Sequence, residues 1–174
     1  MGSRTYTFDA NNGLSDGASA YTASGYAQFS GADGIIDLGG NQNVTITLPS
    51  INSVTSITPQ QARIDLVIPL WVTAINTSAS SVYKIMAVVS NDPSFGAGNV
   101  QVAGMIELGI AASLDVPNGI TTPAPPAIGG NEYEILLATE QNNVFYEYLK
   151  MYHVIAGGSA TITYKAFAAV LPCI

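Results

Sequence analysis

Apolar and polar side chains alternate along most of this chain, and this alternation constrains the fold more than any other feature. It is typical of β-strands that bury one face, because successive side chains of a strand point to opposite sides. No window of about 11 residues follows a helical period with caps. The alternation predicts eight strands, at residues 35–38, 44–48, 64–72, 83–89, 100–108, 133–137, 149–155 and 160–170. We therefore expect an all-β protein, an eight-stranded jelly-roll β-sandwich with an N-terminal arm.

The strand predicted at 64–72 carries two unusual features. Pro69 lies inside it, and proline cannot donate to a ladder, so we expect this strand to lie at a sheet edge or to bulge there. Its outward row consists of Val67, Trp71 and Ile75, which is apolar for a face in water. We expect the arm or a partner to cover that row.

Residues 1–34 break the alternation and predict an arm, which is followed by a jelly-roll domain at 35–174. Glycines interrupt the arm, and a length of 174 residues suits one such domain. A solvated tail does not need several aromatic side chains, so we expect the arm to pack on another surface without being needed by the core. The aromatic residues of the arm are Tyr6, Phe8, Tyr21, Tyr26 and Phe29.

The composition excludes several classes of partner. Charged residues make up 10% of the chain, with 5 Lys and Arg against 12 Asp and Glu, so the net charge is −7. Such a chain cannot neutralise a phosphate backbone, and we expect no nucleic-acid partner. No apolar run approaches the ~20 residues that cross a bilayer, so no membrane partner is expected. The N-terminus has no secretory signal pattern, and the one cysteine, Cys173, excludes an internal disulfide.

Residues with catalytic chemistry are few and scattered. His153, the one histidine, shares the inward row of its strand with Leu149 and Met151, as a hydrogen-bonded core residue does. Spacing alone brings no two carboxylates to one cleft. We therefore expect no enzymatic activity and no cofactor.

Oxygen-bearing side chains gather near the N-terminus, between Asp9 and Asp16. Their spacing does not match the calcium-binding loop of ~12 residues. Turns rich in Asn and Gly explain the same residues. We therefore expect turns there, and no metal ion.

Tyr146, Tyr148 and Tyr152 are predicted on the outward face of one strand, with Lys150 between them. Such a tyrosine stripe suits a platform for sugars, and it equally suits a protein interface, where tyrosine is enriched. A second layer of the same protein that covers the stripe explains it as well. The sequence leaves these three interpretations open.

Segments spread over most of the chain carry a resemblance to a known family. Residues 18–39 run from an alanine- and serine-rich stretch into I-D-L-G, residues 90–95 read S-N-D-P-S-F, and residues 148–171 pair two strands across two glycines. In this order they resemble the opening, the strand-end S-D-D-x-x-F turn and the C-terminal strand pair of one family. These are the small capsid cement, or decoration, proteins of tailed bacteriophages, typified by that of a Bordetella podophage.

The resemblance implies a jelly-roll fold and a structural role in the virion. The protein would bind the outer face of a phage capsid at capsomer junctions, contact the major capsid protein and form homotrimers. The family usually has another aromatic residue where this chain has His153. The alternative is a carbohydrate-binding jelly-roll module that recognises a host receptor. The residues expected at a protein interface are Tyr6, Phe8, Tyr21, Tyr26, Phe29, Val67, Trp71, Ile75, Tyr146, Tyr148 and Tyr152.

Overall fold

The computed structural model describes residues 9–39, 64–76, 81–109 and 131–170. These residues contain one turn of 3₁₀ helix, η1 (Ala10–Asn12), and are otherwise strands and connections, which confirms the all-β prediction. The strands are β1 (Gly13–Asp16), β2 (Gly25–Tyr26), β3 (Gln28–Phe29), β4 (Ala32–Asp33), β5 (Ile35–Asp37), β6 (Asp65–Ile75), β7 (Val82–Ser90), β8 (Gln101–Gly109), β9 (Asn131–Ala138), β10 (Glu140–Gln141), β11 (Val144–Phe145), β12 (Tyr148–Ala156), β13 (Ile162–Phe167) and β14 (Ala169–Val170).

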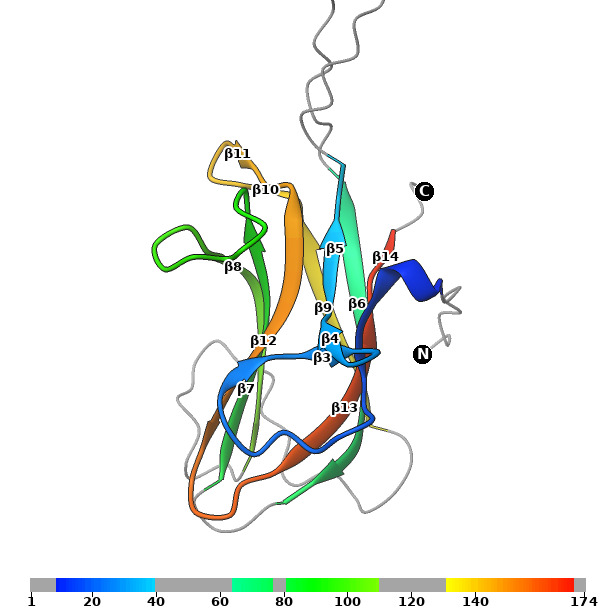
Figure 1. Cartoon of the computed structure of the whole chain (residues 1–174), viewed down its shortest axis with the longest axis vertical. Helices are drawn as coiled ribbons and strands as arrows, with labels where there is room; N and C mark the ends of the chain where they lie inside the picture. The colour runs from blue at the N-terminus through cyan, green and yellow to red at the C-terminus, as the bar shows by residue number, and fades with distance from the viewer. Residues whose placement is uncertain (1–8, 40–63, 77–80, 110–130, 171–174) are drawn as a thin grey trace, which may run out of the picture.

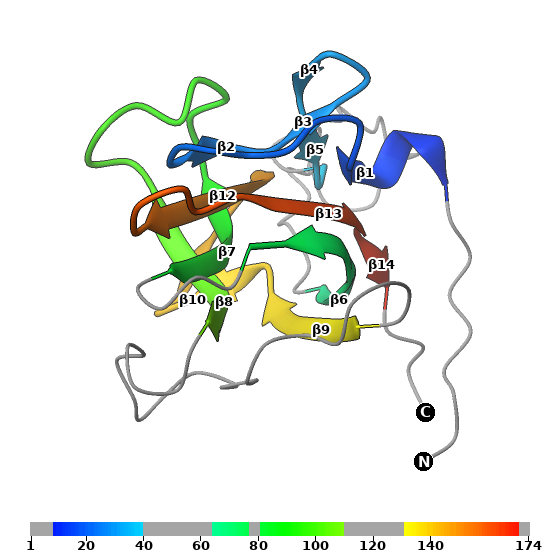
Figure 2. The same cartoon turned by 90° about the horizontal axis from the view of Figure 1, so that it is seen from below.

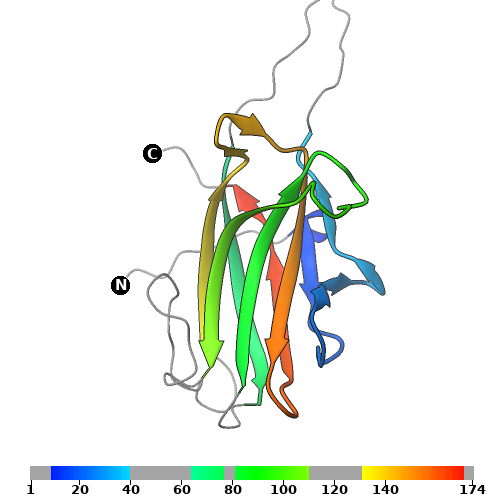
Figure 3. The same ribbon diagram turned by 90° about the vertical axis from the view of Figure 1, so that its left-hand side faces the viewer.

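Two antiparallel sheets pack face to face (Figure 1). Sheet A has the order β1-β13-β6-β9, with β14 following β13 along the same side of β6. Sheet B has the order β2-β12-β7-β8, and β5 also pairs with β12. Figure 3 shows sheet B in front of sheet A, with β8 and β9 side by side at one edge. The arrangement is a β-sandwich whose sheets do not close on each other.

The core lies between the sheets and is built from the inward rows of the long strands. Ile68 and Leu70 of β6 and Ile85 of β7 are completely buried, as their alternating positions predict. The burial of Leu149 and Met151 on β12 follows the same pattern. Period-2 alternation therefore located the long strands correctly, because each of them buries one face.

The prediction of eight strands is not confirmed. The strand expected at 44–48 lies outside the described residues, and the one expected at 160–170 is divided into β13 and β14. Between these two strands, the N–H of Ala168 donates to the carbonyl of Asn12, at 2.9 Å.

The expectation that Pro69 marks a sheet edge is wrong, since β6 is paired on both sides. The ladder on one side is interrupted opposite Pro69, because β13 ends at Phe167 and β14 begins at Ala169. A residue without an N–H is tolerated at such a gap. The bulge in this ladder instead falls beyond Pro69, where Thr163 pairs with Ala74 but Tyr164 pairs with Val72.

That bulge reorganises the row predicted to face outward on this strand. Past Thr73 the alternation shifts by one residue, so the side chain of Ile75 packs against the core. Trp71 remains on the outer face and is half-buried, with its ring stacked on that of Phe167 at 5.5 Å between centroids. Val67 is completely buried and offers no surface to a partner.

The segment expected as an arm contributes strands to both sheets of the sandwich. β1 extends sheet A beside β13, and β2 extends sheet B beside β12 (Figure 2). Leu14 and Ala27 are buried in the core. Strands of two to four residues are too short to show a period, which explains why the sequence did not indicate them.

Two glycines make this packing possible. A Cβ on Gly34 would lie 2.3 Å from the carbonyl oxygen of Leu14, and a Cβ on Gly13 would lie 2.2 Å from the ring of Phe29. The backbone of the N-terminal segment (residues 9–37) thus approaches its neighbours more closely than a side chain allows. Two of the glycines that interrupt the expected arm, Gly13 and Gly34, are therefore sites of tight contact.

Candidate functional site

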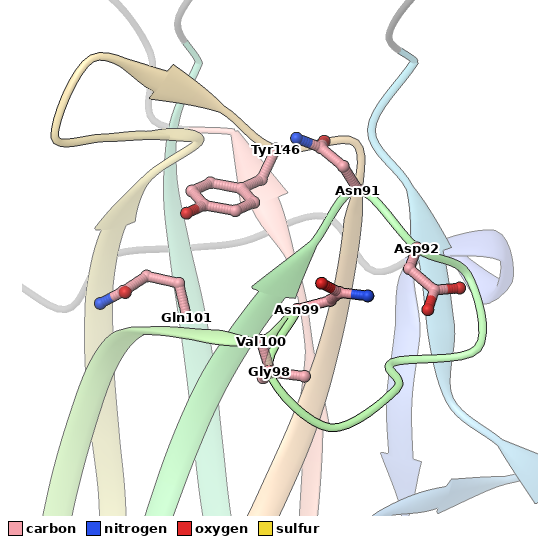
Figure 4. A pocket seen from close by; sticks show the side chains of 7 residues that line it. All are labelled: Asn91, Asp92, Gly98, Asn99, Val100, Gln101 and Tyr146. Atoms are coloured by element: carbon pink, nitrogen blue, oxygen red, sulfur yellow. The ribbon is translucent and has the colours of Figure 1, made fainter.

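A cavity of about 470 Å³ lies at the end of the sandwich where β7 ends and β8 begins. The loop between these two strands is at the upper end of the view in Figure 1. Most of its walls come from the loop at 91–100, which joins β7 to β8, and the rest from the start of β8 and the residues that precede β12. We call it the end pocket. Its lining residues, drawn in Figure 4, are Asn91, Asp92, Gly98, Asn99, Val100, Gln101 and Tyr146.

Asn91 joins two walls of the end pocket. Its side-chain Nδ2 donates to the carbonyl of Phe145 at 3.0 Å, and its Oδ1 accepts from the N–H of Glu147 at 3.0 Å. One side chain therefore replaces the ladder bonds that the chain would make between the end of β7 and the start of β12. The loop and the chain around Tyr146 are held in fixed relative positions.

Asp92 organises the loop itself. Its Oδ1 accepts from the N–H of Ser94 at 2.9 Å and from the hydroxyl of Ser94 at 2.6 Å, and its Oδ2 accepts from the N–H of Gly96 at 3.3 Å. Hydrogen bonds from Ser94 hold the pKa of the Asp92 carboxyl below its usual range. Asp92 is therefore an ionised carboxylate whose oxygens already have donors.

Tyr146 and Gln101 form the wall away from Asp92, and both are labelled on that side of the view in Figure 4. The N–H of Tyr146 donates to the carbonyl of Thr139 at 2.9 Å, and its half-buried ring packs against the core. The Nε2 of Gln101 donates to the carbonyl of Val102 at 3.1 Å. The end pocket thus combines one aromatic ring with several amide groups.

The structure separates the three tyrosines that the sequence placed on one face. Tyr146 precedes β12 and lines the end pocket, whereas Tyr148 and Tyr152 lie on β12 itself. The ring of Tyr152 meets that of Tyr26 edge to face, at 5.0 Å between centroids. Tyr26, expected on the arm, therefore covers part of the outer face of sheet B.

Lys150, between Tyr148 and Tyr152, is almost completely buried on that outer face, with 6% of its surface exposed. Its ammonium lies 3.0 Å from a carboxylate oxygen of Asp33. It also lies 4.8 Å from the ring centroids of both Tyr26 and Phe95. Burial raises the pKa of the Tyr26 hydroxyl, so this ring remains neutral. We call these four residues the lysine clamp; it fastens the N-terminal segment and the loop at 91–100 to sheet B.

His153 lies on the inner side of the same strand and is 2% exposed. Its Nδ1 lies 3.2 Å from the hydroxyl of Tyr164 on the opposite sheet, and its ring lies 4.2 Å from that of Tyr21. Burial lowers the pKa of His153 to about 4, so the imidazole is neutral at pH 7. The prediction of a buried, hydrogen-bonded core histidine is confirmed.

Another hollow, of about 370 Å³, lies on the outer face of sheet A. It brings together two predicted interface residues, Phe29 and Trp71, beside the charged pair Asp16 and Lys165. Tyr6 and Phe8, the remaining aromatic residues of the expected arm, lie outside the described residues.

The oxygen-bearing side chains near the N-terminus support turns, as the sequence indicated. Asp9 accepts from the N–H of Asn11 at 2.9 Å, and Asp16 accepts from the N–H groups of Ala18 at 2.9 Å and Ser30 at 2.8 Å. The bond from Ala18 lowers the pKa of Asp16 most. In the described ranges, no three side chains of His, Cys, Asp or Glu gather as a metal site does. Nor does any helix in this part of the chain have the length and apolarity to cross a bilayer.

Neither a known protein family, nor a curated protein, nor a solved structure matches this chain. The sequence signal of the turn at 90–95 located the loop of the end pocket. It did not indicate Asn99 or Gln101 as lining residues, because the alternation pattern says nothing about polar residues that end a loop.

Proposed function

We propose that this chain is a structural protein of a phage virion, with a jelly-roll fold. It binds the outer face of the capsid, contacts the major capsid protein and stabilises the junctions between capsomers. The carrying observation is that three segments resembling capsid cement proteins, far apart in the sequence, are neighbours in sheet B. Asp37 pairs with Tyr148 on one side of β12, and Ser90 pairs with Tyr148 on the other.

The surface supports a role in protein contacts. Because charged residues are few, most side chains of the protein are uncharged. Contacts made by apolar groups and hydrogen bonds resist salt better than ion pairs do. Large apolar side chains are exposed on several elements: Ile35, Val102, Met105, Leu136, Val144, Phe145 and Val170. Because a capsid presents many identical sites, each contact needs only modest affinity.

The proposal includes self-association as a homotrimer. A trimer that binds three equivalent sites at once gains avidity without any new contact. Sedimentation equilibrium at micromolar concentration is expected to give three times the chain mass of 18.0 kDa. A single species of 18.0 kDa would contradict the trimer.

The deciding experiment mixes the purified protein with empty capsids assembled from the major capsid protein of the same phage. We expect co-sedimentation that saturates at a fixed number of copies per capsid. It should survive about 0.5 M salt, roughly five times the ionic strength of ~0.1 M at which the Debye length is ~10 Å, because such salt screens contacts between exposed charges. A protein that is folded by circular dichroism and does not co-sediment would overturn the proposal.

The exposed apolar side chains of β11 offer a first test of where contact occurs. The double variant Val144→Ser/Phe145→Ser removes two exposed apolar side chains at one end of the sandwich. Leu136→Ser is the matched control, because Leu136 is also exposed but lies within β9. Weaker co-sedimentation of only one of the two variants would identify the face that meets the capsid.

A further inference from the structure

We infer that the end pocket binds a neutral saccharide, such as a hexose or an N-acetylhexosamine at the end of a glycan. This inference does not depend on the proposed capsid contact. Three features of the pocket support this inference: its size, the side-chain amides that lie beside an aromatic ring, and its charge.

The size fits a small ligand with defined contacts. A volume of about 470 Å³ falls in the range of small-molecule sites, which span roughly 300–1,000 Å³. The walls are held by the bonds of Asn91 and Asp92 described above. A pocket whose walls are already ordered loses little entropy when it binds a ligand.

The chemistry of the lining matches that of a sugar ring. A hexose has hydroxyl groups around its edge and C–H groups on its faces, so it needs both polar partners and an apolar surface. The ring of Tyr146 supplies the apolar surface. The side-chain amides of Asn99 and Gln101 each carry two donor hydrogens and an acceptor oxygen. Asn99 uses a donor toward Asp92, and Gln101 uses one toward the carbonyl of Val102. The second donor and the oxygen of each amide suit a hydroxyl group, which both donates and accepts.

The charge of the pocket selects against other ligands. Among the described residues that line the pocket, Asp92 is the one that carries a charge, and it repels anions such as phosphate or carboxylate groups. The same carboxylate has a lowered pKa because Ser94 donates to it twice, and Gly96 donates to its other oxygen. A metal cation would have to displace those donors. A neutral polyhydroxylated ligand is not repelled by Asp92 and does not have to displace the donors of its carboxylate.

The test is a titration of the ¹⁵N-labelled protein, followed by NMR, with glucose, galactose, mannose and N-acetylglucosamine, and with glucuronic acid as the anionic counterpart. We expect at least one neutral sugar to shift the side-chain amide signals of Asn99 and Gln101. The shifts should saturate with a dissociation constant on the order of 1 mM, as suits a ligand of about 12 heavy atoms. Glucuronic acid should bind at least fivefold more weakly.

Two variants locate the site. Gln101→Ala should weaken binding about tenfold, and Tyr146→Ala should abolish it. The first has a close control in Gln141→Ala, because Gln141 also donates its Nε2 to a nearby carbonyl, that of Ala138 at 3.0 Å, but lies outside the pocket. Tyr148→Ala is the control for the tyrosine. Both controls should bind as the unmodified protein does.

Several results would overturn the inference. They are the absence of any saturable shift, equal binding by the Gln101→Ala variant, or binding that EDTA removes. Because the Tyr146 ring packs against the core, its variant is judged only after a thermal melt. If that variant does not fold, the Gln101→Ala result decides alone. If Gln101→Ala loses sugar binding while Gln141→Ala binds as the unmodified protein does, the result would support the site whether or not the protein binds capsids.

Discussion

The two sides of β12 bury basic side chains in different ways, three residues apart. On the outer side, Lys150 has the carboxylate of Asp33 and two aromatic ring faces around its ammonium. On the inner side, His153 has the hydroxyl of Tyr164 and the ring of Tyr21, and its pKa is lowered to about 4 by burial. A buried cation persists where an opposite charge and ring faces replace water, and otherwise the group becomes neutral.

The N-terminal segment contributes to the burial of both basic side chains. It supplies Tyr26 and Asp33 to the outer side of β12 and Tyr21 to the inner side. Lys150 and His153 are therefore both covered in part by residues more than 100 positions earlier in the sequence. The segment is bound to the sandwich through both of its sheets, and removing it exposes both sides at once.

The largest effect is expected from deleting residues 1–34. The deletion removes partners from both sides of β12, two edge strands, and the buried Leu14 and Ala27. These losses exceed the total stability of a typical domain, about 5–15 kcal/mol. We expect a chain without a cooperative thermal transition by circular dichroism. A deletion variant that melts cooperatively near the temperature of the full chain would show that the core does not need the segment.

Acid should destabilise the protein through the inner side of β12. The unfolded chain has a histidine pKa near 6.5, and the folded chain has one of about 4, so the unfolded state binds the proton first as the pH falls. The free energy of unfolding is therefore unaffected by His153 above about pH 6.5. Between about pH 6.5 and pH 4, protonation of this histidine in the unfolded state lowers it progressively, by about 3 kcal/mol. Urea unfolding at pH 7, 5.5 and 4 measures this loss.

His153→Phe is the control for that prediction. It keeps an aromatic ring in the core but leaves the Tyr164 hydroxyl without its partner, so it should cost about 1 kcal/mol at pH 7. Its stability should change little between pH 6.5 and 4, and the variant should become the more stable protein at the acid end. Parallel pH curves for the two proteins would show that another group causes the loss.

On the outer side of β12, the packing of the Lys150 stem should matter more than its charge. Lys150→Ala leaves a void between Tyr26 and Phe95 and should cost about 2 kcal/mol. Lys150→Met fills most of that space without charge and should cost less than about 1 kcal/mol, since an apolar replacement of a buried ion pair is often close to neutral. Chemical denaturation of both variants measures the difference; equal losses would mean that the charge dominates.

The long strands and the role of His153 could be predicted from the sequence because each is a local pattern. Period 2 places Leu149, Met151 and His153 on one face, whatever the rest of the chain does. The same pattern placed Lys150 on the outward face but not in a buried position. Its burial depends on the N-terminal segment and on the loop at 91–100, and no local pattern encodes that contact.

The features that the sequence did not predict share the same physical reason. The bulge near Thr73, which turns Ile75 toward the core, depends on the register of β13 against β6. The tight contacts at Gly13 and Gly34 depend on where Phe29 and Leu14 lie. Each of these is a property of strand pairing between distant segments. The end pocket belongs to the same class, because its walls come from a loop and from the chain before β12.

The smallest effect is expected for the ion pair of the lysine clamp taken alone. Asp33→Asn keeps an oxygen that can accept from the Lys150 ammonium and removes only the negative charge. The Asp33 side chain is 48% exposed, so solvent screens the attraction and the expected cost is about 0.5–1 kcal/mol. That cost should shrink as salt is raised from 0.05 to 1 M, because the Debye length falls to about 3 Å. The cost of Lys150→Ala, which comes from packing, should stay constant over the same range. Urea unfolding at the two salt concentrations distinguishes the contributions, and a loss above about 2 kcal/mol for Asp33→Asn would mean that Lys150 depends on the charge of its partner.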